Sequence, residues 1–472
     1  MPALLSSLID ASRDDLSAVL APDGAPRPCL REWLAGIPDP RSPLGRWHPL
    51  EFVLALAVCA FTAAGHDSPS AIADWASGCS REVLAVLGGR RDPWTGQVRP
   101  PCERTFRRVF ARIDAAALND AVHGYLAAVP RAAPGDLPEA ARHEREQRRA
   151  AAQARKPPVP GMRPQAAADG KTVRGAVRGD GSQVHLLSAF HVGEGRTLAQ
   201  REVSAKTNEI PELAPCLQGL DLAGMVITLD ALHTQRETAR LLREDHGAHY
   251  LMIVKANQPA LLEQVTAALA GADAEFAAAS WAGDGTGHGR REKRSIRTAP
   301  AAGIDWPGAA QVLRIRRDTG PAHGPWTSKE IAYGITSLPA DLAGPRHLAI
   351  YARQHWGIEN RQHYVRDVTF REDAQKARTG NQPNAYAAIR NLVMGAFRRE
   401  GFANIAHARR CYGRDDERIL ALYGYTPTRP DLGQDPVVAE SVRLQPAGLL
   451  YVAPGPAHTT ARTAGRCRMR RR

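Results

Sequence analysis

Apolar residues recur at helical spacing in the N-terminal part of the chain. Four such runs are separated by Gly, Pro and Ser: Leu50–Ala64, Pro69–Ala76, Arg81–Leu87 and Glu103–Ile113. The most apolar stretch, Phe52 to Ala64, is too short to cross a bilayer and has Glu51 and His66 beside it, so we expect a buried helix. The pattern predicts a small all-helical domain over residues 1–130.

The last of these helices has an apolar face and a basic remainder. Its apolar residues are Phe106, Val109, Phe110 and Ile113. Its basic residues are Arg104, Arg107, Arg108 and Arg112. A basic helix after shorter helices can enter a DNA groove and bind a DNA end, whereas an ordinary solvated face has the same pattern. The pattern alone leaves both interpretations open.

Residues 131–165 interrupt this pattern with Pro, Ala, Arg and Glu. They include the polar run EAARHEREQRRAAAQARK, which is followed by PPVPGMRP. Because segments of this composition bury little apolar surface, we predict a linker that is helical in part and marks a domain boundary.

From residue 166 short β-rich runs alternate with helical ones. The expected strands are 184–192, 197–203, 225–231 and 249–256, and the expected helices are 236–245 and 259–270. From about residue 275 to 339 the chain is Gly-rich and strand-like, which predicts a β insertion. Helix returns from His347. We therefore expect an α/β domain over residues 166–425 and a disordered basic tail, rich in Pro, Gly and Arg, over residues 426–472.

The charge of the chain favours a polyanionic partner. Its 472 residues include 62 Lys and Arg against 49 Asp and Glu, which gives a formal net charge of +13. Most of the cations are Arg, whose guanidinium group forks onto phosphate oxygens. Ribosomes and acidic lipids also attract basic proteins, so charge alone favours nucleic acid without establishing it.

The cysteines and the N-terminus bear on the compartment. Seven cysteines are scattered without a C-x-x-C pair, which indicates a reducing compartment and no structural zinc. The start MPALLSSLIDASRDDL has acids within its apolar stretch and lacks the basic beginning of a signal peptide. We expect a cytoplasmic protein without a membrane partner, associated with the nucleoid if its polyanion is DNA.

Two aspartates stand where α/β sheets place ligand-facing groups. Asp169 lies in AAADGKTVRG, where we expect an Asp-Gly turn before Lys171 and Arg174. Asp230 ends the apolar run MVITLDA. Each carboxylate is therefore expected at or beside a strand end. A lone aspartate there is more often a turn former or a helix cap, so neither is a site by itself.

A third carboxylate, Glu359, lies in RQHWGIENRQHYVRDVTFRED. Its polar residues recur at intervals of four, four and three, which places them on one helical face: His355, Glu359, His363 and Arg366. A surface helix held by charge pairs has the same pattern. A functional site is favoured because all three carboxylates lie among Lys, Arg and His in a basic protein.

Carboxylates among cations suit phosphodiester chemistry. In-line displacement at phosphorus needs negative charge stabilised on the attacking and leaving oxygens, and two divalent ions held by carboxylates provide this. Hard oxygen ligands suit Mg²⁺ or Mn²⁺ rather than zinc, and the ions offset the repulsion among the carboxylates. Nearby Lys and Arg would hold the DNA backbone.

A family resemblance rests on motifs spread over residues 30–400. In chain order these are DPRSPLGRWHPLEFVLALAVCA, IADWA, DGKTVRG, SAKTNEIP, ITLDALHTQ, YLMIVKANQP, YGITSLP, HWGIEN, DVTFREDAQKARTGNQP and NLVMGAFR. Together they resemble the DDE insertion-sequence transposases of the H-repeat-associated subfamily. The resemblance implies an α/β fold, an RNase H-like mixed sheet with flanking helices and a β-rich insertion between the second Asp and the Glu, preceded by a small all-helical domain.

Carried over residue by residue, the resemblance assigns the catalytic and metal-binding roles to Asp169, Asp230 and Glu359, with Mg²⁺ or Mn²⁺ as cofactor. It implies cleavage of insertion-sequence ends and their joining to target DNA, with double-stranded DNA and further copies of the chain as partners. The residues expected to contact DNA in the core are Lys171, Arg174, His233, Lys255, His355, Asn360, His363 and Arg366. The wider group often has Arg and Lys where this chain has His355 and Arg366.

Two other functions stay open on the sequence. An RNase H-like nuclease would share the carboxylates and metals but would release a hydrolysed product without joining it to a target. An inactive derivative of a transposase would only bind DNA, and the intact set of three carboxylates argues against it.

Overall fold

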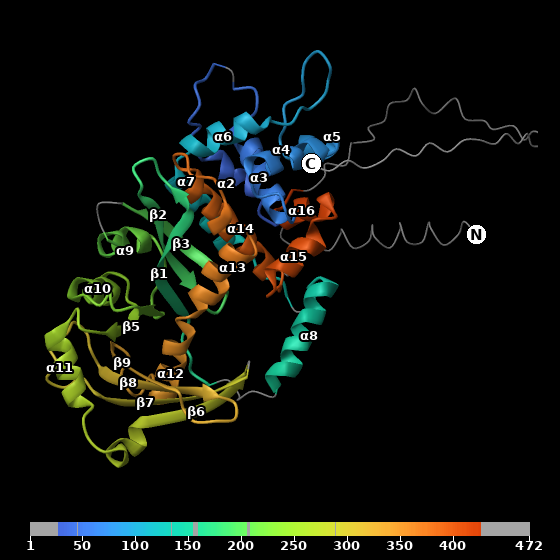
Figure 1. Ribbon diagram of the computed structural model, residues 1–472. Coiled ribbons are helices and arrows are strands. Elements are labelled where there is room, and N and C mark those ends of the chain that lie inside the picture. Colours follow the sequence, from blue (N-terminus) through green and yellow to red (C-terminus); the bar gives the residue numbers. More distant parts are fainter. Residues whose placement is uncertain are drawn as a thin grey trace, which may run out of the picture. The chain divides into compact units, whose positions relative to one another are not determined.

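The computed structural model describes residues 27–44, 46–133, 135–153, 159–204, 208–287 and 289–425. The expected basic tail, 426–472, lies outside these residues, as do residues 1–26. The described part of the chain combines a nine-stranded mixed sheet with helices on its faces and a set of helices before the sheet (Figure 1). The expected α/β fold class is confirmed.

Five strands of the sheet have the RNase H-like arrangement. They are β1 (Gln165–Val177), β2 (Gln183–His191), β3 (Arg196–Val203), β4 (Val226–Leu229) and β5 (His249–Val254). Their order is β3-β2-β1-β4-β5, in which the first three strands are antiparallel and β4 and β5 run parallel to β1. All four residues of β4 are buried, as expected for a short apolar run at the centre of a sheet.

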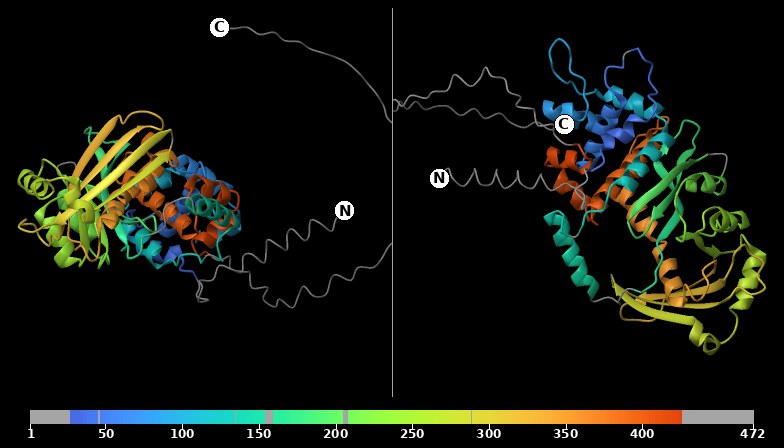
Figure 2. Two further views of the ribbon diagram at one scale, coloured as in Figure 1. Left: turned by 90° about the horizontal axis from the view of Figure 1, so that it is seen from below. Right: turned by 180° about the vertical axis from the view of Figure 1, so that it is seen from behind.

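The predicted β insertion forms four strands that continue the same sheet. These are β6 (Ser280–Gly287), β7 (Arg290–Pro300), β8 (Gln311–Pro321) and β9 (Ser328–Thr336). They form antiparallel pairs in the order β9-β8-β7-β6, and β9 pairs with β5 (Figure 2). Because β9 extends the hydrogen-bonded ladder of β5, the insertion continues the sheet that β1 to β5 begin.

Helices cover both faces of the sheet. On one face lie α9 (Ile210–Leu217), α10 (Arg236–Arg240) with the π turn η2 (Leu241–Asp245), and α11 (Pro259–Ala268). The short helix η3 (Asp273–Ala279) precedes β6, and α12 (Pro345–Gln354) packs on the other face. The two cores follow from the pleat of β4, since Ile227 belongs to the first and its neighbour Val226 to the second.

The N-terminal helices share one core with the C-terminal helices. The first group is α2 (Leu30–Ala35), α3 (Leu50–Thr62), α4 (Pro69–Gly78), α5 (Arg81–Val86), α6 (Glu103–Arg112) and α7 (Ala115–Ala128). The second is α14 (Gln382–Arg399), α15 (Ile405–Tyr412) and α16 (Asp416–Leu422). The ring of Tyr386 on α14 lies edge-on to Phe61 and Phe110, with centroids 5.2 and 5.0 Å away. The four helices expected from periodicity, including a buried α3, are confirmed.

Part of the expected linker is the helix α8 (Glu139–Gln153), and its first turns are anchored. Leu137 and Ala141 are buried in the helical core, and the Glu144 carboxylate accepts hydrogen bonds from the backbone N–H groups of Ala403 and Asn404. The partly helical character is thus confirmed, whereas the domain boundaries at 130/131 and 165/166 stay predictions. The six cysteines among the described residues are free, and no described helix is long and apolar enough to span a membrane.

Candidate functional site

Strand β1 positions the first carboxylate. It continues through Asp169 and Gly170, which pair with Ser188 and Leu187 of β2, so the predicted Asp-Gly turn is wrong. On its other side β1 pairs with β4 only as far as Ala168. Asp169 is therefore paired with β2 on one side of β1. On the other side it is the first residue after the pairing with β4 ends.

Asp230 directly follows the last residue of β4, as expected. Ala168 pairs with Leu229 across the parallel strands, so Asp169 and Asp230 are the next residues on two neighbouring strands. The Asp230 Oδ1 atom accepts hydrogen bonds from the backbone N–H groups of Leu232 at 3.0 Å and His233 at 3.3 Å. These bonds fix the carboxylate at the strand end.

The segment that carries Glu359 is irregular. The regular helix α12 ends at Gln354, and Glu359–His363 form the π turn η4 before α13 (Tyr364–Val368). The predicted single helical face from 355 to 366 is therefore wrong in its regularity, although Glu359 and His363 still lie side by side. Single π turns are frequent at functional sites, because they re-aim side chains within an otherwise helical segment.

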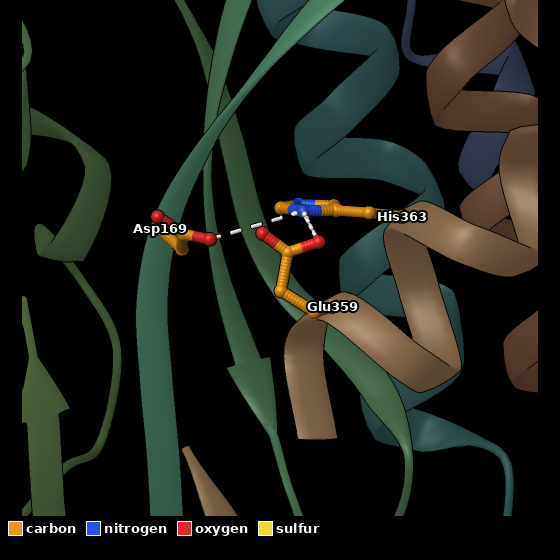
Figure 3. A group of neighbouring side chains, drawn as sticks. All are labelled: Asp169, Glu359 and His363. Atoms are coloured by element: carbon orange, nitrogen blue, oxygen red, sulfur yellow. Dashed lines mark ion pairs between the residues drawn. The ribbon is translucent and has the colours of Figure 1, made fainter. Parts of the chain in front are cut away.

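Asp169, Glu359 and His363 come together from β1 and η4 (Figure 3). The His363 Nδ1 atom lies 3.3 Å from Glu359 Oε2 and 3.9 Å from Asp169 Oδ2. One potential ligand atom from each residue lies within 4.8 Å of the others. Asp230 does not belong to this group of described residues, and its carboxylate accepts the two backbone hydrogen bonds given above.

The two carboxylates of this group differ in their affinity for a proton. Burial and the neighbouring Glu359 carboxylate raise the pKa of Asp169 to about 8. The pKa of Glu359 is lowered, because His363 makes a hydrogen bond to it that outweighs its partial burial. Near neutral pH the pair therefore retains a proton on Asp169. Both carboxylates can be ionised together only when an additional cation binds beside them.

These residues fit a hard divalent cation. Carboxylate oxygens are the donors that Mg²⁺ and Mn²⁺ prefer, whereas zinc sites are built mainly from nitrogen and sulfur. The His363 Nε2 atom is buried without a hydrogen-bond partner in the described part of the chain, so the ring is oriented through Nδ1, on the carboxylate side. Asp169 and Glu359 could hold an ion, with Asp230 at the neighbouring strand end.

Glu209 is a residue of the site that the sequence analysis missed. Its carboxylate bridges two imidazoles, at 2.8 Å from His185 Nε2 and 3.0 Å from His233 Nε2. Burial raises its pKa, but the hydrogen bonds of the two histidines outweigh burial and hold the pKa at about 2. The carboxylate also lies against β1, since a Cβ added at Gly170 would be only 2.2 Å from Glu209 Oε1.

Glu209 thereby connects the two segments that position Asp169 and Asp230. His185 is paired with Thr172 of β1, and the backbone of His233 donates to Asp230. The motif SAKTNEIP contains Glu209 and was among the family motifs, which was the available signal. Its role can be recognised only in the tertiary structure, because the two histidines come from β2 and from the segment after β4.

Two buried cations among the predicted DNA contacts are held in ion pairs within the protein. The Lys171 Nζ atom is 2.7 Å from Asp367 Oδ1 and 3.6 Å from Asp373 Oδ1, and its side chain is 7% exposed. Arg366 is fully buried, 2.8 Å from Glu372 Oε2. Because a phosphate cannot reach Arg366 in this structure, its geometry supports a structural role.

The other predicted contacts divide into histidines that are held by neighbouring residues and exposed side chains. His233 is held by Glu209, and His355 Nδ1 lies 3.1 Å from Thr228 Oγ1 of β4. Burial lowers the pKa values of His355 and His363. The exposed residues are Arg174, Lys255, Asn360 and the four arginines of α6, Arg104, Arg107, Arg108 and Arg112.

An RNase H-like sheet with carboxylates on β1, after β4 and on the segment that follows an insertion defines the class of this protein. The chain belongs to the transposase DDE domain family, whose profile matches residues 158–394. Residues 31–126 match the DDE_Tnp_1-associated family. The family resemblance and the RNase H-like fold are thereby confirmed, and the family supports a transposase function.

Several named relatives agree with this assignment. YncI of Escherichia coli O157:H7, named as a candidate transposase, is 27% identical over 384 residues, which cover 78% of this chain and 87% of the relative. YhhI of Escherichia coli K12, named as a candidate H repeat-associated transposase, is 30% identical over 242 residues, or 48% and 62% of the two chains. A solved piggyBac transposase synaptic complex with hairpin DNA covers 78% of this chain at a TM-score of 0.31 and 10% identity, too low a similarity to support a conclusion.

Proposed function

We propose that this transposase cleaves the ends of an insertion sequence and joins them to target DNA, with Mg²⁺ or Mn²⁺ as cofactor. The observation that carries the proposal is the meeting of Asp169 and Glu359, from distant parts of a chain of the DDE family, beside the strand end that bears Asp230. Carboxylates in this arrangement match the needs of phosphodiester transfer.

Two displacements at phosphorus make up the proposed reaction. In the first, a water oxygen bonds to phosphorus and the bond to a 3′ oxygen breaks, which frees a 3′-hydroxyl at the element's end. In the second, that hydroxyl oxygen bonds to a target phosphorus, and the target's own 3′ oxygen leaves with a proton. One P–O bond forms and one breaks in each step, so no reductant or nucleotide is required.

The chain's own residues hold and orient the groups around this reaction. Asp169, Asp230 and Glu359 would bind the divalent ions, which stabilise charge on the attacking and leaving oxygens when they are bound. His363 orients Glu359 through its Nδ1 atom, and the backbone after β4 orients Asp230. Both carboxylates are thus fixed before DNA arrives.

Exposed cations supply the proposed DNA contacts. In the core these are Arg174 and Lys255, and Asn360 adds an amide. The α6 arginines are the proposed contacts to the element's ends, as phosphate contacts or as base contacts in a groove. Because an element has two ends, we propose that two or more copies of the chain act together on DNA at the nucleoid.

The test is a cleavage and joining assay with a labelled duplex that contains an element end, incubated with an unlabelled target duplex. With Mg²⁺ or Mn²⁺ the wild-type protein should give both nicked strands and longer joined strands on a denaturing gel. Asp169→Asn, Asp230→Asn and Glu359→Gln should each lower both products by roughly a thousandfold, because several kcal/mol of transition-state stabilisation are lost. The exposed Asp221 provides the control variant Asp221→Asn, which should retain wild-type activity.

The products also separate the alternatives. Nicked strands without joined strands would identify a nuclease, and binding without either product would identify an inactive derivative. Normal turnover by any of the three carboxylate variants in Mg²⁺, with the variant's purity confirmed, would show that the residue assignment is wrong.

A further inference from the structure

A basic cavity lies between the N-terminal helices and the segment that follows α13. It has a volume of about 380 Å³. Its wall combines residues before and at the start of α4, one residue of α6, the segment 370–377 and the start of α14. The residues with polar or charged side chains are Asp67, Ser68, Ser70, Arg107, Arg371, Gln375, Lys376 and Gln382. Residues from both regions that the two family profiles match therefore line the cavity.

The cations of this cavity exceed its acids. Arg371 and Lys376 are exposed, and neither forms an ion pair or a side-chain hydrogen bond with the described residues. Arg107 is paired with Glu103 at 2.6 Å on the surface of α6. The acid in the wall, Asp67, already lies 3.7 Å from Arg409 behind it. Two uncompensated positive charges thus face solvent.

The cavity wall is held firmly in place. The Gln375 side chain donates to the backbone oxygen of Asp67 at 2.6 Å, and Asn381 donates to the backbone oxygen of Ile113, just after α6, at 2.7 Å. Arg371 has a φ of 52°, in the left-handed region that a residue other than glycine seldom adopts. Such a backbone conformation persists only when its surroundings impose it, which is typical of binding sites.

A direct path leads from the catalytic carboxylates to this cavity. The segment 373–375 lies against β1, since a Cβ added at Gly175 would be 2.4 Å from the backbone oxygen of Gln375. Gly175 is six residues beyond Asp169 on β1, which is about 20 Å at 3.3 Å per residue. That span equals roughly six base pairs of B-form DNA at 3.4 Å each. The exposed Arg174 lies on this path, beside Gly175.

We propose that this cavity binds backbone phosphates of the same duplex that is cut at Asp169 and Glu359, roughly six base pairs from the reacting phosphate. The inference rests on the proposed function, because it assumes that DNA is the substrate. The ligand is the phosphate backbone, because roughly half to two-thirds of all protein–DNA hydrogen bonds, many of them from Lys and Arg, go to phosphate and sugar. The hydroxyls of Ser68 and Ser70 at the start of α4 add neutral donors to the same wall.

The experiment compares the double variant Arg371→Gln/Lys376→Gln with the wild-type protein. Glutamine keeps a Cβ at position 371, so the left-handed backbone is under the same constraint in both proteins. The control is Arg142→Gln/Arg414→Gln, which removes two exposed arginines outside the cavity that have no ion pair with described residues. Melting temperatures of all three proteins should agree. DNA affinity is then measured over a range of salt concentrations with an end-containing duplex.

Loss of two phosphate contacts should reduce the slope of log affinity against log salt by about 1.8, at ~0.9 per contact. The control should keep the wild-type slope. Two further duplexes are shortened to about four base pairs beyond the cleavage site, one on each side. On the duplex that lacks the side that contacts the cavity, the wild-type and Arg371→Gln/Lys376→Gln slopes should coincide.

An unchanged slope on the long duplex, an equal loss in the control, or a loss that persists on both shortened duplexes would overturn the inference. Cleavage of the duplex by the wild-type protein separates the two proposals. If the wild-type protein cleaves and joins normally while the slope is unchanged, only the cavity proposal fails. If the wild-type protein neither binds nor cleaves end DNA, the proposed function fails with it.

Discussion

Two carboxylate clusters, one fully buried and one partly open to solvent, balance their charge in opposite ways. Glu372, in the short helix η5 (Glu372–Ala374), is 1% exposed and lies 2.8 Å from Arg366 and 2.6 Å from Arg390. Burial raises its pKa, but the two arginines outweigh burial, and the pKa is lowered overall. Asp169 faces Glu359 and His363 instead, and its pKa is raised to about 8.

This difference separates a cluster that is complete within the chain from one that needs a cation from outside. Each negative charge of the Glu372 cluster has a fixed guanidinium partner, so the cluster can serve the packing of α13 against α14. The Asp169 cluster places two carboxylates together without an arginine between them, an arrangement that costs stability unless a proton or a metal ion compensates.

The largest expected effect comes from neutralising the two clusters with matched amides. Glu372→Gln should lower the free energy of unfolding by about 3–5 kcal/mol, because it leaves two buried guanidinium groups unpaired. Asp169→Asn should leave the free energy of unfolding unchanged or raise it, because a neutral amide can lie partly buried beside Glu359 without taking up a proton. Urea denaturation followed by tryptophan fluorescence measures both. Equal destabilisation by the two variants would mean that the clusters do not differ as described.

A smaller effect is expected from Glu209, which lies beside the Asp169 cluster. Glu209→Ala should weaken Mn²⁺ binding about 10- to 100-fold, because residues that orient metal ligands have effects of this size. The matched control is Glu212→Ala on α9, which removes a carboxylate paired with the exposed Arg201. Isothermal titration of the DNA-free protein with Mn²⁺ gives the affinities. If the folded Glu209→Ala protein binds Mn²⁺ with wild-type affinity, Glu209 contributes to packing and does not orient the metal ligands.

The smallest expected effect is stabilisation by the metal itself. At a Mn²⁺ concentration ten times its dissociation constant, the wild-type protein should gain about 1.4 kcal/mol, since the ion binds only the folded state. The gain should appear as a higher melting temperature that a chelator reverses. Asp169→Asn and Glu359→Gln should show little or no increase. If Mn²⁺ raises the melting temperature of both variants as much as that of the wild-type protein, the ion binds at another site.

The sequence predicted the parts of the molecule that local patterns encode. Alternating and apolar runs predicted the strands β2 to β5, and the strand-like composition of residues 275–339 predicted the insertion that contains β6 to β9. The end of the apolar run before Asp230 located its carboxylate. The Asp-Gly dipeptide at 169–170 suggested a turn, but pairing with β2 overrides this local preference and keeps the segment extended. Tertiary pairing also determines whether an arginine is a ligand contact, as the burial of Arg366 shows.

Long-range packing explains the remaining differences. Helices α3, α6 and α7 bury their apolar faces against α14, more than 250 residues later in the chain. No periodicity within residues 1–130 reveals that partner, and the bounds of the predicted helical domain stay a prediction. Glu209 was missed for the same reason, because its meaning depends on two histidines that β2 and β4 bring to it.

Gly170 has a consequence for how this family tolerates change. A methyl group there would lie 2.2 Å from the Glu209 carboxylate and 2.5 Å from the His185 ring, so it would have to displace these two hydrogen-bonded side chains. In a library of single substitutions selected for transposition, this position should therefore be as intolerant as the carboxylates beside it. A position without a side chain would then be as intolerant of substitution as a residue that takes part in the chemistry. Selection would preserve glycine there because Glu209 and His185 occupy the place of a side chain.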